Sequence, residues 1–254
     1  MTTQPIHLLS TRPLPGRLIE QSAAAGIILD TLSFISTTPV ADEGLGRRIR
    51  DLAGSPLAAI FTSMNAVEAV RDWLQLGPGA KTSYTPSPWR IFCIGGATRR
   101  LIAGHFGEAA IAGTAESARS LAETIVGWEG AREVFFFCGD HRREELPSML
   151  QRQGFTVNEW VVYRTIPTPH RTERVYDGIA FFSPSAVESF FSVNTVAMET
   201  RLFAIGRTTA AAIGARCDNQ ILTSDRPEKE ALVSNMIEYF SNKRKDKASD
   251  HTQE

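Results

Sequence analysis

This 254-residue sequence contains few of the residues that build metal centres, disulfides or nucleic-acid surfaces. It has three cysteines and five histidines, and none of them falls in a paired ligand motif such as His-Glu-x-x-His. Because the cysteines are odd in number and lie in or beside apolar runs or a turn, we expect reduced thiols and no bound metal. The net charge of −1, without a basic stripe, argues against nucleic acid as a partner.

Long apolar runs are missing as well. The longest, such as residues 134–138, are too short to cross a membrane, and the first ten residues lack the pattern of an export signal. We therefore expect a cytoplasmic protein without a membrane partner. The composition is that of an ordinary globular protein, and 254 residues can bury one large core or two smaller ones.

The common catalytic and phosphate-binding motifs are also absent. The sequence contains no Gly-x-Ser-x-Gly, no Gly-x-x-x-x-Gly-Lys-Ser/Thr and no Gly-x-Gly-x-x-Gly. Acidic residues are scarce in the predicted turns, and Asp140 is the clearest of them. If the protein is an enzyme, we expect it to work by positioning and electrostatics more than by covalent or strong acid–base chemistry.

What the sequence does contain is an internal duplication. The repeated segments read as an apolar run, a turn with small hydroxyl residues and a helical pattern, which predicts a buried strand followed by a helix. In a further pair, Gly26 lies opposite Gly154, and each glycine follows a predicted helix. The matching pairs are 61–68 with 181–188, 90–95 with 201–206, and 18–34 with 146–162.

The order of the repeats predicts the domain organisation. Strands that alternate with helices indicate parallel sheets, and hence two similar α/β domains. Each half of the chain carries the pieces that complete the other, so we expect one domain to be built from both chain ends. The expected parts are a first domain of 1–35 and 170–242, an inserted second domain of 40–163, connections at 36–39 and 164–169, and a disordered tail at 243–254.

The predicted turns at the carboxyl ends of the strands carry the candidate binding residues. Ligands of open α/β sheets bind at these ends, and hydroxyl, guanidinium and backbone N–H groups there bind carboxylates or phosphates. The serines and threonines could instead simply cap helices, but such turns in both halves favour a shared anionic ligand between the domains. The candidates are Thr11, Arg12, Ser63, Thr98, Arg142, Ser183, Ser185, Thr208 and Thr209.

Tyr163 is a separate candidate. It ends the apolar segment Trp160-Val161-Val162 and lies at the second predicted connection. The sequence alone leaves two interpretations open, a core or strand-end tyrosine and a tyrosine that faces the ligand.

Taken in order, these stretches resemble the uroporphyrinogen-III synthase family. The matching segments span residues 6–240 and are each weak alone, whereas their ordered set is specific. The resemblance implies two α/β domains joined by a two-stranded linker, with the active site in the cleft. The segments are 11–13, 61–67, 94–98, 138–144, 162–165, 182–187 and 204–210.

The resemblance also implies a reaction. Such an enzyme, a hydro-lyase of haem biosynthesis, takes the linear tetrapyrrole hydroxymethylbilane, removes water, inverts the last pyrrole ring and closes the macrocycle to uroporphyrinogen III. The usual mechanism passes through an azafulvene cation and a spiro intermediate, without metal or cofactor. The carboxylates of this substrate suit the hydroxyl-rich turns.

By motif, the resemblance implies that Tyr163 is the catalytic residue, which assists the departure of the hydroxyl group or binds near it. Hydroxyl groups of the matching turns would bind the propionate and acetate side chains. One departure is that many members have Arg-Gly where this chain has Cys138-Gly139, which makes Arg142 or Arg143 a possible substitute. The matching turn residues are Ser63, Thr98, Ser183 and Thr209.

On the same resemblance we expect a monomer whose substrate is hydroxymethylbilane. A transient contact with the upstream bilane synthase, which would hand over an unstable product, stays open. The alternative function is a non-catalytic module that binds a bilane or another polyanion, such as a sugar phosphate, on the same scaffold, because a fold does not fix a function.

Overall fold

The computed structural model describes residues 5–75, 88–225 and 228–250. The chain divides into two compact units, Met1–Ser36 with Ile166–Glu254 (unit 1) and Thr37–Thr165 (unit 2). Both chain ends therefore belong to unit 1. The two boundaries fall inside the predicted connections 36–39 and 164–169.

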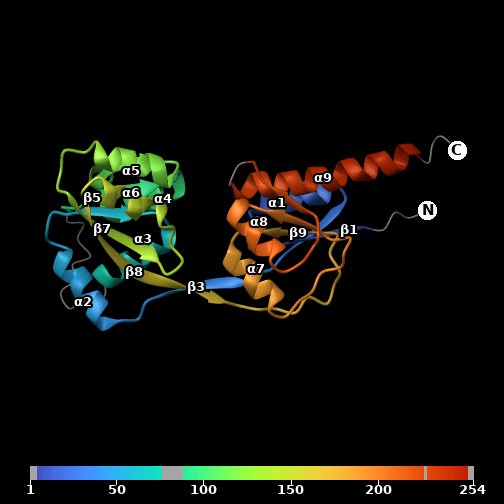
Figure 1. Ribbon diagram of the computed structural model, residues 1–254, viewed down its shortest axis with the longest axis horizontal. Helices are drawn as coiled ribbons and strands as arrows, with labels where there is room; N and C mark the ends of the chain where they lie inside the picture. The colour runs from blue at the N-terminus through green and yellow to red at the C-terminus, as the bar shows by residue number, and fades with distance from the viewer. Residues whose placement is uncertain (1–4, 76–87, 226–227, 251–254) are drawn as a thin grey trace. The chain divides into compact units, whose positions relative to one another are not determined.

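Unit 1 is a parallel sheet between two layers of helices (Figure 1). Helices α1 (Gly16–Ala24) and α9 (Lys229–Asp250) cover one face, and α7 (Pro184–Phe191) and α8 (Arg207–Gly214) cover the other. The strand order is β11-β10-β9-β1-β2. The strands are β1 (Ile6–Ser10), β2 (Ile27–Thr31), β9 (Gly178–Phe181), β10 (Arg201–Ala204) and β11 (Ile221–Thr223).

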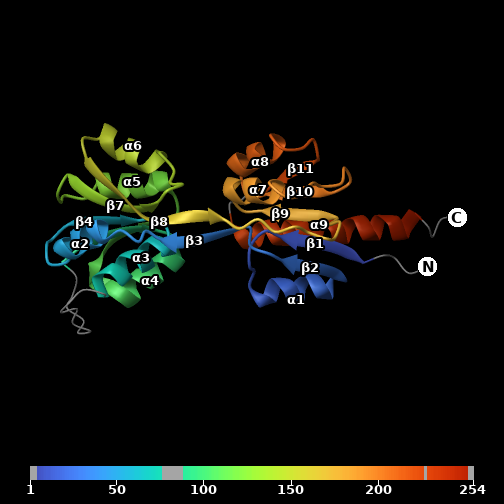
Figure 2. The same ribbon diagram turned by 90° about the horizontal axis from the view of Figure 1, so that it is seen from below.

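Unit 2 has the same layers around the sheet β3-β8-β7-β4-β5-β6 (Figure 2). Its strands are β3 (Ile35–Pro39), β4 (Ala58–Phe61), β5 (Arg90–Ile94), β6 (Ile111–Ala115), β7 (Glu133–Gly139) and β8 (Thr156–Pro167). One face is covered by α2 (Glu43–Leu52), α3 (Met64–Gln75) and α4 (Gly96–Phe106). The other face is covered by α5 (Ala118–Val126) and α6 (Glu145–Arg152). A short helix, η1 (Glu108–Ala110), follows α4. The chain passes between the units within β3 and β8, which pair with each other.

The duplicated segments occupy equivalent places in the two units. The order β6-β5-β4-β7-β8 in unit 2 corresponds to β11-β10-β9-β1-β2 in unit 1. Gly26 and Gly154 both follow a helix with positive φ, +68° and +79°, a conformation in which glycine avoids a steric penalty. The pattern of buried and exposed residues is identical over 61–70 and 181–190, and over 91–99 and 202–210.

The prediction of an α/β fold with parallel sheets is confirmed. The prediction of a disordered tail from residue 243 is wrong for most of that stretch, because α9 continues to Asp250. Lysine, arginine and alanine are frequent there and favour helix, so a helix already anchored by buried residues up to Phe240 can extend. Residues 251–254 lie outside the described residues. No described helix is long and apolar enough to span a bilayer.

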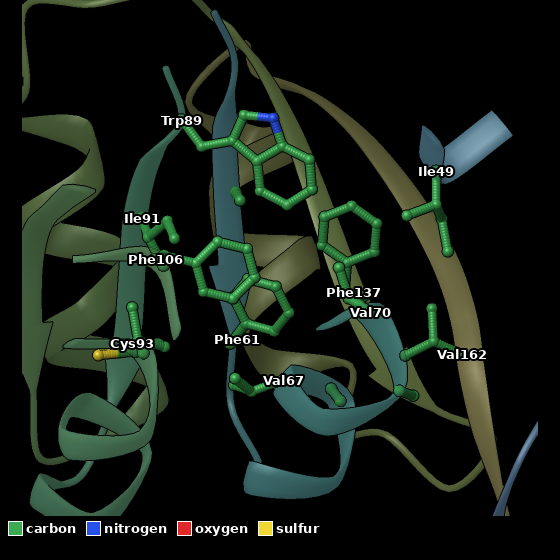
Figure 3. Close-up of a cluster of buried hydrophobic side chains, with 14 of the residues drawn as sticks. Ile49, Phe61, Val67, Val70, Trp89, Ile91, Cys93, Phe106, Phe137 and Val162 are labelled. Carbon is green, nitrogen blue, oxygen red and sulfur yellow. The ribbon is translucent and has the colours of Figure 1, made fainter. Parts of the chain in front are cut away.

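An aromatic cluster fills one face of the unit 2 sheet (Figure 3). The ring of Phe137 stacks on Phe61 at 5.2 Å between centroids and on Trp89 at 5.6 Å. Phe106 of α4 stacks on the same indole at 5.7 Å. Three consecutive phenylalanines, Phe135–Phe137, are typical of a strand buried on both faces, and β7 lies between β8 and β4 with helices on both faces.

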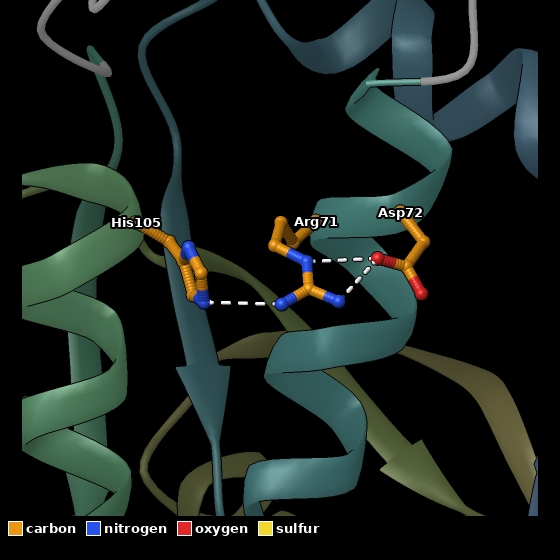
Figure 4. Close-up of polar contacts among 3 residues, drawn as sticks. All are labelled: Arg71, Asp72 and His105. Atoms are coloured by element: carbon orange, nitrogen blue, oxygen red, sulfur yellow. Dashed lines mark hydrogen bonds and ion pairs between the residues drawn. The ribbon is translucent and has the colours of Figure 1, made fainter.

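A polar contact ties α3 to α4 on the same side of the sheet (Figure 4). Arg71 Nη1 lies 3.2 Å from Nε2 of His105, and Arg71 Nε donates to Asp72 Oδ1 at 2.8 Å. Since a guanidinium can only donate, His105 Nε2 must be the unprotonated nitrogen of a neutral ring. Burial, and then the Arg71 charge, lower the pKa of His105 below its ordinary value of 6.5.

This contact predicts acid sensitivity. Because the folded-state pKa of His105 is lowered, its contribution to the free energy of unfolding is complete above the ordinary pKa of 6.5 and is lost as the pH falls below it. His105→Gln keeps an acceptor for Arg71 but does not titrate. We expect wild type to lose more stability than this variant between about pH 8 and about pH 5 in urea unfolding.

The measurement can isolate unit 2, since all four tryptophans, Trp73, Trp89, Trp128 and Trp160, lie within it. Tryptophan emission therefore follows the unfolding of the unit that contains His105. A difference between wild type and variant that stays constant with pH would contradict the prediction.

Candidate functional site

In each sheet, strands that follow one another in the chain are added toward one edge in one part and toward the opposite edge in the other, and the two parts meet between two neighbouring strands. In unit 1 this place lies between β1 and β9, and in unit 2 between β7 and β4. The helices that follow two such neighbouring strands cover opposite faces of the sheet. Ligands of open α/β sheets bind at this place, outside the carboxyl ends of the strands. All of the candidate residues follow the carboxyl end of a strand or, like Tyr163, lie near one.

Tyr163 lies against Gly139 at the end of β7 in unit 2. A Cβ atom built on Gly139 would be 2.4 Å from Tyr163 Cζ and 2.7 Å from its hydroxyl oxygen, so only glycine leaves room for the ring in this position. The register explains the approach, because Cys138 pairs with Val161 and Gly139 with Tyr163, which leaves Val162 as the extra residue of a β-bulge.

The bulge also changes the face on which the tyrosine lies. Consecutive strand residues normally point to opposite faces, yet Val162 and Tyr163 both pack against the aromatic cluster of unit 2. Asp140 holds the strand ends together, since its N–H donates to the Tyr163 carbonyl at 3.3 Å and its Oδ1 accepts from Thr165 N–H at 3.0 Å. The phenol is therefore positioned by backbone geometry.

Arg142, which follows β7 in the chain, is already paired with carboxylates. Arg142 Nη1 donates to Glu144 Oε1 at 2.5 Å, and Arg142 Nε forms an ion pair with Glu159 of β8. The hydrogen bond to Glu144, with the added charge of Glu159, raises the pKa of Arg142. Burial raises the pKa of the Cys138 thiol to about 12, so this side chain is neutral.

The hydroxyl residues of unit 2 occupy helix starts. Ser63 Oγ accepts from Ala66 N–H at 3.3 Å, which is the contact of an N-cap at α3. Its hydroxyl hydrogen can still be donated, because capping uses only an acceptor lone pair. Thr98 is buried in the first turn of α4. The capping interpretation and the binding interpretation are therefore compatible for Ser63.

Unit 1 repeats this arrangement. Ser183 caps α7 by accepting from Ala186 N–H at 3.2 Å, and Thr209 is buried in the first turn of α8 as Thr98 is in α4. Ser185 is half-buried in the first turn of α7, whereas Thr208 is exposed. Three of these four residues thus stand at a helix start with at least part of the side chain enclosed.

Thr11 and Arg12 follow β1 and differ in role. Thr11 is buried, and both its N–H and its hydroxyl donate to the Ala180 carbonyl, at 3.0 and 2.8 Å, so it joins β1 to β9. The Arg12 guanidinium lies over the Phe182 ring, 5.6 Å from its centroid. Its Nε is buried without a hydrogen-bond partner, and burial lowers the pKa of Arg12.

The structure therefore distributes the candidates over two edges. The sequence had suggested neither Gly139 nor Phe182 as a site residue. A glycine at the end of a buried strand was a usable signal for Gly139, but its contact with Tyr163 depends on a bulge that the residue pattern does not show. Unit 1 holds Thr11, Arg12, Ser183, Ser185, Thr208 and Thr209, and unit 2 holds Ser63, Thr98, Arg142 and Tyr163.

The close approach of Gly139 and Tyr163 predicts the effect of a single methyl group. We expect Gly139→Ala to destabilise unit 2 by about 1–3 kcal/mol, because the ring must move away from its packed position. Urea unfolding followed by tryptophan emission measures this. Gly54→Ala is the matched control, since a Cβ there meets no atom within 4 Å. Equal stability of the two variants would contradict the contact.

The comparisons with known proteins agree with this architecture. The family model described as uroporphyrinogen-III synthase HemD matches residues 16–234. A uroporphyrinogen-III synthetase from Helicobacter pylori superposes with a TM-score of 0.63 at 17% identity, covering 92% of this chain and 99% of that one. A mutant uroporphyrinogen III synthase from Thermus thermophilus gives 0.59 at 17% identity, covering 94% and 99%.

Within the described residues no three histidine, cysteine, aspartate or glutamate side chains gather as a metal site would require. The solved structures share the fold, and the family model extends over most of the chain. The chain belongs to the uroporphyrinogen-III synthase family.

Proposed function

We propose that this protein is a working uroporphyrinogen-III synthase that cyclises hydroxymethylbilane with loss of water and inversion of the last ring. The observation that carries the proposal is the placement of Tyr163 on Gly139 at the carboxyl edge of the unit 2 sheet, in a chain of this family. Both backbone features that hold the phenol, the bulge and the glycine, would be unnecessary for an ordinary surface tyrosine.

The proposed role of Tyr163 follows from the first chemical step. The terminal hydroxyl group of the bilane must leave as water, and it departs more easily when it accepts a hydrogen bond from an acid. A phenol is neutral at ordinary pH and has one O–H to donate. Because its position is set by the strand backbone, the donor needs little reorganisation when the carbon–oxygen bond breaks.

The proposed substrate also explains the supply of anion-binding groups. Its acetate and propionate side chains are carboxylates, which accept hydrogen bonds from hydroxyl groups and pair with guanidinium. Ser63 and Ser183 keep a hydroxyl hydrogen to donate while they cap their helices. The Nε of Arg12 is buried and has no partner in the described chain, so its N–H is left to donate to a carboxylate oxygen.

The direct test is to supply the purified protein with fresh hydroxymethylbilane and resolve the oxidised products by isomer. We expect mainly the type III porphyrin, since only ring inversion produces it. The control without protein forms the type I isomer by spontaneous closure. Type I alone in the presence of protein would contradict the proposal and favour a non-catalytic module that binds the bilane.

Tyr163→Phe tests the assigned role. Removing the phenol while keeping the ring should lower kcat by about 10²-fold, with a melting temperature close to wild type because the packing against Gly139 is retained. The matched control is Tyr239→Phe, which removes a phenol that accepts from Arg201 Nε at 3.3 Å in the α9 layer of unit 1. Wild-type rates in Tyr163→Phe, with unchanged melting, would remove Tyr163 from the mechanism.

A further inference from the structure

The carboxyl edge at β1 and β9 in unit 1 and its counterpart at β7 and β4 in unit 2 differ in charge at equivalent positions. Leu8 of β1 pairs with Gly178, and Val134 of β7 pairs with Ala58, which is the counterpart of Gly178 in the 120-residue repeat. Counting onward by four residues along the strands, Arg12 in unit 1 stands where Cys138 stands in unit 2. The later repeat of 18–34 with 146–162 is offset by two more residues, because unit 2 has two additional residues between this strand and the helix that follows. A guanidinium thus replaces a neutral buried thiol.

The nearby charges enlarge this difference. In unit 2 the arginine that follows β7, Arg142, is neutralised by Glu144 and Glu159. In unit 1 no carboxylate of the described chain forms an ion pair or hydrogen bond with Arg12. The carboxyl edge of the sheet thus occurs in two copies, and of these two arginines only the half-buried Arg12 in unit 1 lacks a carboxylate partner in the described chain.

A second cation, Lys229, lies at the same edge. Arg17 in the first turn of α1 forms an ion pair with Glu230 in the first turn of α9, so the starts of these helices are neighbours. Leu18 of α1 and Leu232 of α9 also belong to one apolar cluster. α1 begins four residues after Arg12, and Lys229 is the first residue of α9, so both cations stand beside the joined starts of these two helices.

The electrostatics agree with that placement. Partial burial, and then the Arg12 charge, lower the pKa of Lys229, although its side chain reaches solvent. Glu230, the carboxylate beside it, is held by Arg17, and Lys229 has no ion pair among the described residues. Two like charges at one edge repel each other, and an anion between them would remove that cost.

We propose that Arg12 and Lys229 form a carboxylate-binding site at the carboxyl edge of the unit 1 sheet, and that it anchors an acetate or propionate side chain of the bilane. This assignment rests on the proposed function for the identity of its ligand. The guanidinium lies over the Phe182 ring, and its Nε–H donor has no partner in the described chain, so a carboxylate oxygen would satisfy it. Lys229 adds a mobile second charge.

The experiment uses uroporphyrin III, the stable oxidised form of the proposed product, as the probe and measures its Kd by titration of porphyrin fluorescence. We expect Arg12→Gln and Lys229→Gln each to weaken binding about ten-fold, the loss of one charged hydrogen bond. Lys229→Arg should bind nearly as wild type does. The charge-matched control is Arg216→Gln, an exposed cation after α8 at the amino edge of the same sheet.

Salt provides a second measurement that a folding defect would not mimic. Binding through two cations should weaken as ionic strength rises, and each glutamine variant should show a smaller salt effect than wild type. Lys229 is exposed, so its replacement by glutamine should leave the fold intact even if Arg12→Gln lowers the melting temperature. If Lys229→Gln shows the same Kd and the same salt dependence as the control Arg216→Gln, the proposed site is wrong.

The outcome for the site and the outcome for the proposed function can be told apart. If wild type forms the type III isomer while Arg12→Gln and Lys229→Gln keep wild-type KM and Kd, the site is wrong and the function stands. If wild type forms no type III isomer but binds the porphyrin in a way that needs Arg12 and Lys229, the function is wrong and the site stands.

Discussion

The pairing of β1 with β9 is the interaction on which the rest of the structure depends. It joins segments about 170 residues apart, through the register of Leu9 with Ile179, the donation of His7 N–H to Asp177 Oδ2 and the buried contact of Thr11 with the Ala180 carbonyl. All of unit 2 lies in the chain between them. Because the entropy cost of closing a loop grows by only roughly 0.6 kcal/mol per doubling of its length, inserting a whole folded unit there is tolerable.

The same pairing creates the edge where the functional groups gather. Strand addition reverses at β1 and β9, so the helices that follow these strands cover opposite faces of the sheet, and ligands of such sheets bind outside the carboxyl ends of the strands at this place. Duplication gives unit 2 an equivalent edge at β7 and β4, and the two copies have since diverged in their side chains. One edge carries a phenol with balanced charges, and the other carries cations without a counterion in the described chain.

Much of this fold could be predicted from the sequence, because apolar runs and repeated turns are local signals. The helix starts at Ser63 and Ser183 followed from residue type alone. The pairing of Arg142 with Glu159 could not be predicted, since it depends on how β8 aligns with β7. The contact of Gly139 with Tyr163 could not be predicted either, because a bulge creates it. The extension of α9 was missed because a charged stretch was taken as disordered, although its residues favour helix.

The difference between the two edges has a chemical reason in the proposed reaction. Loss of the hydroxyl group leaves positive charge on the bilane, and an unpaired cation close to the reacting ring would raise the energy of that step. At the edge that carries Tyr163, Cys138 is neutral and two carboxylates compensate Arg142. Carboxylate binding, by contrast, needs uncompensated cations, and Arg12 and Lys229 would supply them in the other copy of the same fold. A duplicated scaffold can in this way separate anchoring from bond breaking, two tasks with opposite electrostatic requirements.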